Sequence, residues 1–340
     1  MLKAIDLSLA SVCGADCIFC PHDRGERIRK KLMPFELVRK IIDEISSEEF
    51  RKEHQIEIIS VGENGDAFLN KDLIEILRYI KEKLPNIKVV LSTNFQNFTK
   101  DKAKLILGEK LIDEFSCNID GSNSQNYYNV KKMDYNRIMK NLKDFLEIRG
   151  NLNFPLAVSI ISLNRYIKTI KHSFKSLPVK LEDASMENIS DDSLIIEKKL
   201  KEILKPIDRI FKSWIFGWAE REKVNPNKLN YQNYSCRNLG RIKTEAFIAP
   251  DGTWYACCFD SNNELILGNV IEKSINEIFY SEKRKKLIKM LENKKFGEIG
   301  GPCKTVNCCQ RLFKSDWEKT RVNLNKIRKI LIYKFKKIFR

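Results

Sequence analysis

Long hydrophobic runs are missing from this sequence of 340 residues. A membrane-spanning helix needs roughly 18 or more consecutive apolar residues, and no run comes near that length. Residues 1–6 contain an early aspartate and no extended apolar segment, which is unlike a secretory signal. Internal repeats and low-complexity segments are also absent. With 43% hydrophobic and 31% charged residues, the composition predicts a globular, cytoplasmic protein.

The first 215 residues alternate between short β-rich segments and longer amphipathic segments. Strands are predicted at 3–9, 57–61, 87–92, 112–119, 154–161 and 179–182. Helices are predicted at 34–47, 71–84, 99–107, 134–148, 166–176 and 194–214. Such alternation is typical of βαβ units that build a parallel sheet. We therefore expect an α/β protein whose first domain, residues 1–215, is a partial (β/α)6 TIM-like barrel.

The pattern changes after residue 215. Residues 216–235 are rich in Asn and charge and predict a connector. Residues 247–257 predict a hairpin with its turn at Asp251 and Gly252, and a helix is predicted at 275–291. Together with the later cysteines, these features predict a small α+β domain over residues 236–312. A basic helix at 313–340 completes the expected organisation.

Nine of the ten cysteines fall into two groups. In a chain without a secretory signal, grouped cysteines are more often metal ligands than disulfides. The first group, Cys13, Cys17 and Cys20, forms a C-x3-C-x2-C motif after the first predicted strand, at the edge where β/α barrels place their chemistry. Three thiolates can hold three corners of an iron–sulfur cube and leave one iron open. A zinc site with a distant fourth ligand is the alternative, and the isolated Cys117 is expected to be a buried apolar side chain.

With Phe19 before its third cysteine, this motif resembles that of the radical S-adenosylmethionine (SAM) enzymes. The resemblance implies that Cys13, Cys17 and Cys20 bind a 4Fe–4S cluster whose fourth iron is chelated by S-adenosylmethionine. It also implies an oxidoreductase-type activity. One electron from the cluster would cleave the cofactor to methionine and a 5′-deoxyadenosyl radical, which abstracts a hydrogen from the substrate.

Positions at other predicted strand ends resemble the cofactor-binding segments of this family. Residues 60–63 are similar to its Gly-Gly-Glu segment, although Val61 replaces the first Gly and Asn64 replaces a following Pro. Residues 118–121 resemble its Ser-x-Asp-Gly segment, and Asp120 is our candidate catalytic proton acceptor. Each such residue could instead be a helix cap or a turn former. The resemblance assigns cofactor binding to Gly62, Glu63, Thr93, Asn94, Asn118, Ser159 and Asn164.

The second cysteine group resembles the SPASM or shorter twitch extension of the same family. Cys236 is followed by a C-x15-G-x4-C pattern that ends at Cys257, and residues 267–269 also match that extension. A full SPASM domain carries a longer cysteine run than Cys303-x4-Cys308-Cys309, so we expect one auxiliary 4Fe–4S cluster. The expected ligands are Cys236, Cys257, Cys303 and Cys308, with Cys309 competing for the last place. Zinc suits four thiolates equally well.

Cys258 is left over from this group. A spare thiol near the barrel mouth could donate a hydrogen atom, as in epimerases that the chain resembles. We favour the simpler interpretation that Cys258 is a packed or exposed side chain.

The net charge of +17 is concentrated at the end of the chain. Residues 319–340 hold nine Lys or Arg and no acid, and their apolar residues fall on one helical stripe. This pattern fits a helix lying on an anionic membrane surface, such as the inner face of the cell membrane. Amphipathicity more often means a helix packed on the protein core. No recognition motif accompanies the charge, so nucleic acid is not an expected partner.

The leading hypothesis is therefore a radical SAM oxidoreductase that takes electrons from a flavodoxin or ferredoxin. Only twelve residues precede Cys13, so we expect no preceding peptide-recognition domain, which favours a sugar or carrier-linked glycan over a peptide substrate. A peptide-modifying maturase or epimerase is the alternative. The second alternative is a non-catalytic scaffold that binds zinc or a cluster. It is motivated by residues 61 and 64, which depart from the family pattern.

Overall fold

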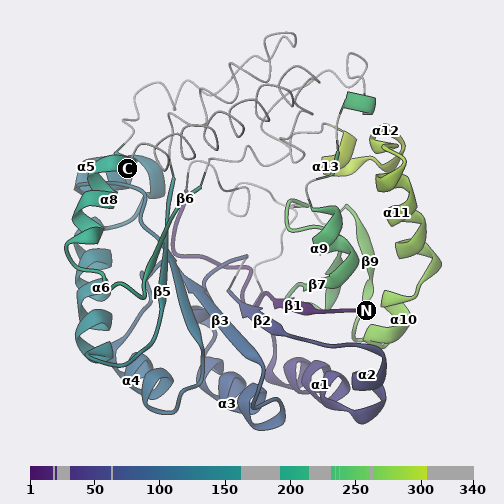
Figure 1. Ribbon diagram of the computed structural model, residues 1–340, viewed down its shortest axis with the longest axis horizontal. Helices are drawn as coiled ribbons and strands as arrows, with labels where there is room; N and C mark the ends of the chain where they lie inside the picture. The colour runs from purple at the N-terminus through teal and green to yellow at the C-terminus, as the bar shows by residue number, and fades with distance from the viewer. Residues whose placement is uncertain are drawn as a thin grey trace, which may run out of the picture.

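The structure, a computed structural model, describes residues 1–17, 20, 31–62, 64–161, 192–213, 231–233, 235–236, 238–260 and 264–304. Its centre is a sheet with the strand order β6-β5-β4-β3-β2-β1-β7-β8-β9 (Figure 1). The first six strands run parallel to one another. They are β1 (Ala4–Leu7), β2 (Ile58–Val61), β3 (Lys88–Thr93), β4 (Glu114–Asn118), β5 (Leu156–Ile161) and β6 (Arg209–Ser213).

Helices cover the outer face of these parallel strands (Figure 1). On the first of them, Val38, Ile41 and Ile45 recur at helical spacing and pack in one core with Ile59 and Val89 of the sheet. The helices of this part are α1 (Phe35–Ser46), α2 (Glu48–Glu53), α3 (Leu73–Lys83), α4 (Lys100–Gly108), α5 (Ser124–Lys131), α6 (Tyr135–Arg149) and α8 (Ser193–Lys201), with a 3-10 turn η1 (Ala67–Leu69).

The opposite face of the strands carries polar side chains among smaller apolar ones. Ser92 lies beside Ser116 and Asn118 lies beside Ser159 in the strand register, and these side chains are half-buried or exposed. Their neighbour Cys117, which points the other way, is 1% exposed, as expected for a buried apolar side chain. Because strand side chains alternate between faces, the apolar residues pack under the helices and the polar ones line the interior.

The arc of strands is open. Within the described residues, β6 pairs only with β5, and the free side of β1 pairs in parallel with β7 (Glu245–Ile248). The remaining strands, β8 (Thr253–Tyr255) and β9 (Ile266–Asn269), continue the sheet in antiparallel fashion. This arrangement confirms the predicted partial TIM-like α/β barrel followed by a smaller C-terminal part.

The predicted hairpin is also confirmed. Phe247 pairs with Tyr255 across β7 and β8, and Gly252 in the turn has a φ of 81°, which favours glycine. The C-terminal part also holds η4 (Tyr231–Asn233), α9 (Leu239–Thr244), α10 (Ile275–Phe279), α11 (Glu282–Glu292), α12 (Phe296–Ile299) and α13 (Gly301–Lys304).

The helix predicted at 194–214 is wrong beyond its first half. Helix α8 ends at Lys201, and residues 209–213 form β6, the sixth parallel strand. Pro206 cannot continue a helix because it lacks an N–H donor and clashes with the preceding turn. Asp208 then orders the connection, because its carboxylate accepts from the backbone N–H of Leu156 (2.9 Å) and pairs with the buried Arg149 of α6.

The single helix predicted at 275–291 is also wrong. It is divided into α10 and α11, because Ser281 caps a new helix by accepting a hydrogen bond from the backbone N–H of Arg284 (3.3 Å). The predicted helix at 166–176, the strand at 179–182 and the basic helix at 313–340 lie outside the described residues. In the part of the chain that is described, no helix is long and apolar enough to cross a membrane.

His54 joins the base of the barrel to the C-terminal part. Its Nδ1 accepts a hydrogen bond from the backbone N–H of Leu2 (3.3 Å), which places the ring proton on Nε2. Nε2 then donates to Asn276 Oδ1 (2.8 Å) on α10. The ring packs edge-on against Phe50 and Phe279. Burial lowers the pKa of His54, so this contact depends on a neutral ring.

Mild acid should weaken this contact. Because the pKa of His54 is lowered by folding, the folded protein binds the proton less tightly than the unfolded chain, whose histidine pKa is about 6.5. The contribution of the neutral ring is thus complete above about pH 6.5 and is lost as the pH falls through the lowered folded value. The free energy of unfolding, measured with urea at a series of pH values, should decrease as the pH is lowered below about 6.5. This decrease should be steeper in the wild type than in His54→Gln. Equal slopes would contradict this account.

Candidate functional site

The loop that leaves the carboxyl end of β1 carries the first three cysteines. Its backbone is held by two neighbouring segments: Asp66 N–H donates to Val12 O (3.0 Å), and Asp16 N–H donates to Lys131 O (3.2 Å) at the end of α5. The approach is close at Gly65, where an added Cβ would lie 2.3 Å from a carbonyl oxygen of the loop. The loops after β1 and β2 therefore fit together only with glycine at this position.

The three thiols on this loop are free of disulfides; Cys17 is buried, and Cys13 and Cys20 are half-buried. Asn94 Nδ2, from the end of β3, donates a hydrogen bond to Cys13 Sγ (3.1 Å). Burial raises the pKa of Cys13 to about 11, so its thiolate needs a compensating positive charge to be stable at neutral pH. A bound metal centre supplies such a charge, and the chemistry of these thiols is compatible with one.

A buried ion pair lies beside this loop. Lys131 Nζ is 2.7 Å from Asp120 Oδ2, and the two side chains are 4% and 0% exposed. Asp120 Oδ1 also accepts from the backbone N–H of Ile161 (2.8 Å). Burial by itself would lower the pKa of Lys131, but the charges of Asp120 and Cys17 raise it well above its ordinary value. The charged ammonium group of Lys131, paired with Asp120, therefore lies near the cysteine loop.

The hydroxyl of Tyr127 on α5 is fully buried and has no hydrogen-bond partner among the described residues. Burial raises its pKa, and Lys131, Asp120 and Cys17 all act on that pKa, which puts the hydroxyl near the same thiol. A buried hydroxyl without a partner is costly. A group bound beside Cys17 with an acceptor atom would satisfy it, so this part of the site fits an iron–sulfur cluster.

The predicted cofactor-binding residues divide between two environments. Gly62, directly after β2, has a φ of 92°, and a Cβ there would lie 2.3 Å from Ser92 O. Thr93 Oγ1 is buried and donates to Asp66 Oδ1 (3.0 Å), so its hydroxyl stabilises the loop that follows β2. Asn118 and Ser159, by contrast, lie side by side on the polar inner face. The structure therefore brings Asn118 and Ser159 together and turns Thr93 away, whereas residues 63 and 164 lie outside the described residues.

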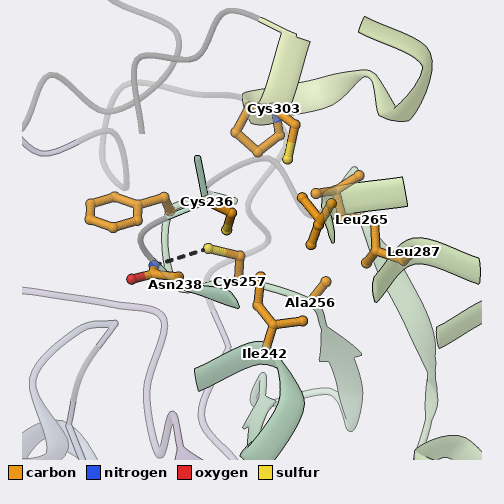
Figure 2. Close-up of a pocket in the computed structure, with 11 residues that line it drawn as sticks. Cys236, Asn238, Ile242, Ala256, Cys257, Leu265, Leu287 and Cys303 are labelled. Atoms are coloured by element: carbon orange, nitrogen blue, oxygen red, sulfur yellow. Dashed lines mark hydrogen bonds between the residues drawn. The ribbon is translucent and has the colours of Figure 1, made fainter. Parts of the chain in front are cut away.

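Three of the later cysteines line a second cavity, shown in Figure 2. Cys236 precedes α9, Cys257 lies two residues after the end of β8, and Cys303 belongs to α13. Figure 2 shows the sulfur atoms of Cys236 and Cys257 pointing into the same space, with Cys303 approaching from another side. The rest of the wall is mainly apolar and includes Leu265 and Leu287. Cys308 and Cys309 lie outside the described residues.

Two polar side chains serve the thiols of this second region. Asn238 Nδ2 donates to Cys257 Sγ (3.3 Å) and to Cys258 Sγ (3.4 Å), and Arg241 Nη1 donates to Cys258 Sγ (3.4 Å). Hydrogen bonds from Cys258 and Asn238 lower the pKa of Cys257 to about 7, against the effect of burial. A substantial fraction of Cys257 is therefore present at neutral pH as the thiolate, which is the form that binds metals.

Within the described ranges, no three side chains of His, Cys, Asp or Glu stand close enough together to hold a single metal ion. In the described part of the chain, both thiol groups are thus open arrangements.

Four residues beside the thiols do not stand out in the sequence patterns: Lys131, Tyr127, Asn238 and Arg241. The first two lie on α5, a helix that the patterns do not predict. Asn123 is the available signal, because this residue caps α5 by accepting from the backbone N–H of Asn126 (2.9 Å). Asn238 and Arg241 have no signal except their nearness to Cys236 in the sequence.

Comparison with known families gives two matches. The family model of the Radical SAM superfamily matches residues 7–169, and the SPASM model, described as an iron–sulfur cluster-binding domain, matches residues 236–311. A curated protein, the FeMo cofactor biosynthesis protein NifB of Methanocaldococcus jannaschii, is 22% identical over 291 residues, which are 83% of this chain and 87% of the relative.

Two solved structures share the fold. The structure of BtrN in complex with AdoMet and 2-DOIA has a TM-score of 0.53 and 14% identity, and the match covers 92% of this chain and 94% of BtrN. The structure of Streptococcus suis SuiB bound to the precursor peptide SuiA has a TM-score of 0.53 and 14% identity. That match covers 83% of this chain and 65% of SuiB.

The ion pair beside the cysteine loop yields a stability prediction. Lys131→Met leaves the Asp120 carboxylate buried without its partner, so the free energy of unfolding should fall by about 3–5 kcal/mol. The neighbouring exposed Lys132→Met is the matched control and should change it by less than about 0.5 kcal/mol. Chemical denaturation of both variants checks this. Equal losses would contradict the buried pair.

Proposed function

The chain belongs to the radical SAM superfamily and carries a SPASM domain, and from this premise we propose that it abstracts a hydrogen atom from a sugar or carrier-linked glycan. It is a radical SAM enzyme whose cofactors are a 4Fe–4S cluster, S-adenosylmethionine and an auxiliary iron–sulfur cluster. When bound, the first two supply the electron and the 5′-deoxyadenosyl radical for hydrogen abstraction. The chain itself supplies the ligands, the hydrogen-bond donors and the polar interior.

The observation that carries the proposal is the loop of Cys13, Cys17 and Cys20 at the carboxyl end of β1. We assign these thiolates to the radical-generating cluster. Asn94 would stabilise the Cys13 thiolate through its N–H donor, since hydrogen bonds to charged acceptors are stronger than neutral ones. Lys131 would offset part of the negative charge that accumulates on the ligands.

S-adenosylmethionine would lie across the neighbouring strand ends, on the polar inner face. We assign side-chain contacts with it to Asn118 and Ser159, together with Glu63, Asn94 and Asn164. Gly62 and Thr93 would contact it through their backbone, because the Thr93 hydroxyl is turned toward Asp66. The burial and ion pairing of Asp120 support a positioning role for that carboxylate, which holds Lys131 in place, rather than the proton-acceptor role expected from the sequence.

The second cavity would hold the auxiliary cluster. Cys236, Cys257 and Cys303 already line it, and we assign the fourth position to Cys308, with Cys309 as the alternative. Asn238 supports this assignment, because its amide donates to the thiol of Cys257. In this arrangement Cys258 is hydrogen-bonded next to the site and is not a ligand.

The choice of substrate class depends on the interior and on the relatives. Beside the residues assigned to the cofactor, the inner face carries the small hydrogen-bonding residues Ser92 and Ser116, which suit a hydroxyl-rich substrate. The match to BtrN, solved with AdoMet and 2-DOIA, extends over nearly the full length of both chains. The match to SuiB, solved with a precursor peptide, favours the alternative of a peptide substrate.

Cofactor cleavage is the first test. The anaerobically reconstituted wild type should form 5′-deoxyadenosine from S-adenosylmethionine when dithionite is added, and Cys17→Ala should form none. The matched control is Cys117→Ala, which removes a buried thiol that we do not assign to a cluster and should keep the activity. If the wild type forms no more 5′-deoxyadenosine than Cys17→Ala, the assignment as an enzyme is overturned in favour of a non-catalytic scaffold.

Metal analysis tests the auxiliary site. With about four irons and four sulfides per cluster, the wild type should hold about eight of each and Cys257→Ala about four. Cys258→Ala is the matched control and should keep both clusters. One zinc per chain with a single cluster, or loss of a cluster only in Cys258→Ala, would contradict the assignment.

Isotope transfer tests the substrate class. A candidate sugar or carrier-linked glycan deuterated at the reacting carbon should pass deuterium into 5′-deoxyadenosine, because the radical takes the hydrogen atom directly. A deuterated peptide serves as the alternative arm. Transfer from the peptide alone would replace the sugar or glycan proposal with a peptide-modifying activity.

A further inference from the structure

A groove about 280 Å³ in volume lies on the outer side of the C-terminal part, between β9 and α11. Its floor is apolar and includes Leu265, Leu287 and Met290, and its rim carries Lys283 and Lys286. Both lysines are exposed. The groove thus combines an apolar floor with a basic edge, which suits a charged protein partner better than a small apolar ligand.

Leu265 and Leu287 also line the cavity that holds the thiols of Cys236, Cys257 and Cys303. Figure 2 shows both leucines beside that cavity. A single layer of side chains therefore separates the outer groove from the thiols. An electron arriving in the groove would have a short path to a centre bound in the cavity.

The surface around the groove is strongly basic. Residues 282–304 contain eight Lys or Arg and three Glu. Of these acids, Glu282 is paired with Lys285, Glu292 with Lys243, and Glu298 with Lys295. No acidic side chain in the described part of the chain forms an ion pair with the exposed lysines at 283, 286 and 289. The charge of these three lysines is therefore available to a partner. Glu264 and Glu298 also line the groove and leave its interior close to neutral.

We propose that this groove, with Lys283, Lys286 and Lys289 of α11, is the docking surface for an acidic one-electron carrier protein of the flavodoxin class. The carrier's reduced flavin would give up one electron, and the auxiliary cluster would take it, with no bond made or broken. The proposal rests on the proposed function, because it requires a cluster in the second cavity.

The physics of such encounters suits this surface. Electron-transfer complexes are transient and bury little area, generally below about 1,200 Å², so a small groove with a charged rim is sufficient. Complementary charge mainly accelerates association, and its effect falls as salt screens it. An acidic carrier should therefore reduce this chain quickly at low salt and more slowly at high salt.

The test compares two triple variants of the reconstituted protein. Lys283→Glu/Lys286→Glu/Lys289→Glu reverses the charge at the groove. Lys71→Glu/Lys104→Glu/Lys143→Glu is the matched control, with the same change in net charge on exposed lysines of the barrel. Stopped-flow absorbance follows oxidation of flavodoxin hydroquinone, calorimetry follows binding of oxidised flavodoxin, and dithionite reduction reports the clusters without docking.

The groove variant should lose at least about tenfold in the flavodoxin rate at low salt, bind oxidised flavodoxin more weakly, and keep its dithionite rate, whereas the control should behave as wild type. Equal flavodoxin rates in both variants would overturn the docking surface. So would binding of phosphatidylglycerol vesicles through these lysines without any change in the flavodoxin rate. A wild type that dithionite does not reduce would instead overturn the proposed function itself.

Discussion

Strand β1 pairs with β2 on one side and with β7 on the other, and both thiol regions depend on this double pairing. The first cysteine loop leaves the carboxyl end of β1, and Cys257 follows the strand that pairs with β7. Hydrogen-bonded strands lie about 4.8 Å apart, so the sheet sets the spacing between the two regions. A cluster bound in one region and a cluster bound in the other would thus be held by one continuous set of backbone hydrogen bonds.

The two thiol regions use the same physical devices. In each, a side-chain amide donates to a cysteine sulfur: Asn94 to Cys13 and Asn238 to Cys257. Each also has a cation nearby, Lys131 at the first and Arg241 at the second. They differ in balance, because burial dominates at Cys13 and raises its pKa, whereas hydrogen bonding dominates at Cys257 and lowers its pKa. The first region therefore depends more on the charge of its bound group.

Sequence patterns were sufficient where a local rule governs the structure. Helix α1 follows from its apolar spacing, and the β7–β8 hairpin follows from Asp251 and Gly252, because these features act within a few residues. The sequence patterns failed where contacts with residues far along the chain determine the local structure. Residues 209–213 form a strand since they pair with β5 and since Asp208 is tied to Arg149, a residue about 60 positions away. Pro206 is the sequence signal that the helix ends before this residue.

The sequence by itself determined the cysteine spacings, the alternation of helices with the first five parallel strands, and the family that these patterns resemble. Only the tertiary structure decided which polar groups surround the thiols. It buries the Asp120–Lys131 pair beside the first loop, turns the Thr93 hydroxyl toward Asp66 in the loop after β2, and places Leu265 and Leu287 between the second cavity and the outer groove. The reason is physical: spacing along a chain is a local property, whereas burial, charge pairing and wall thickness depend on which distant elements fold together.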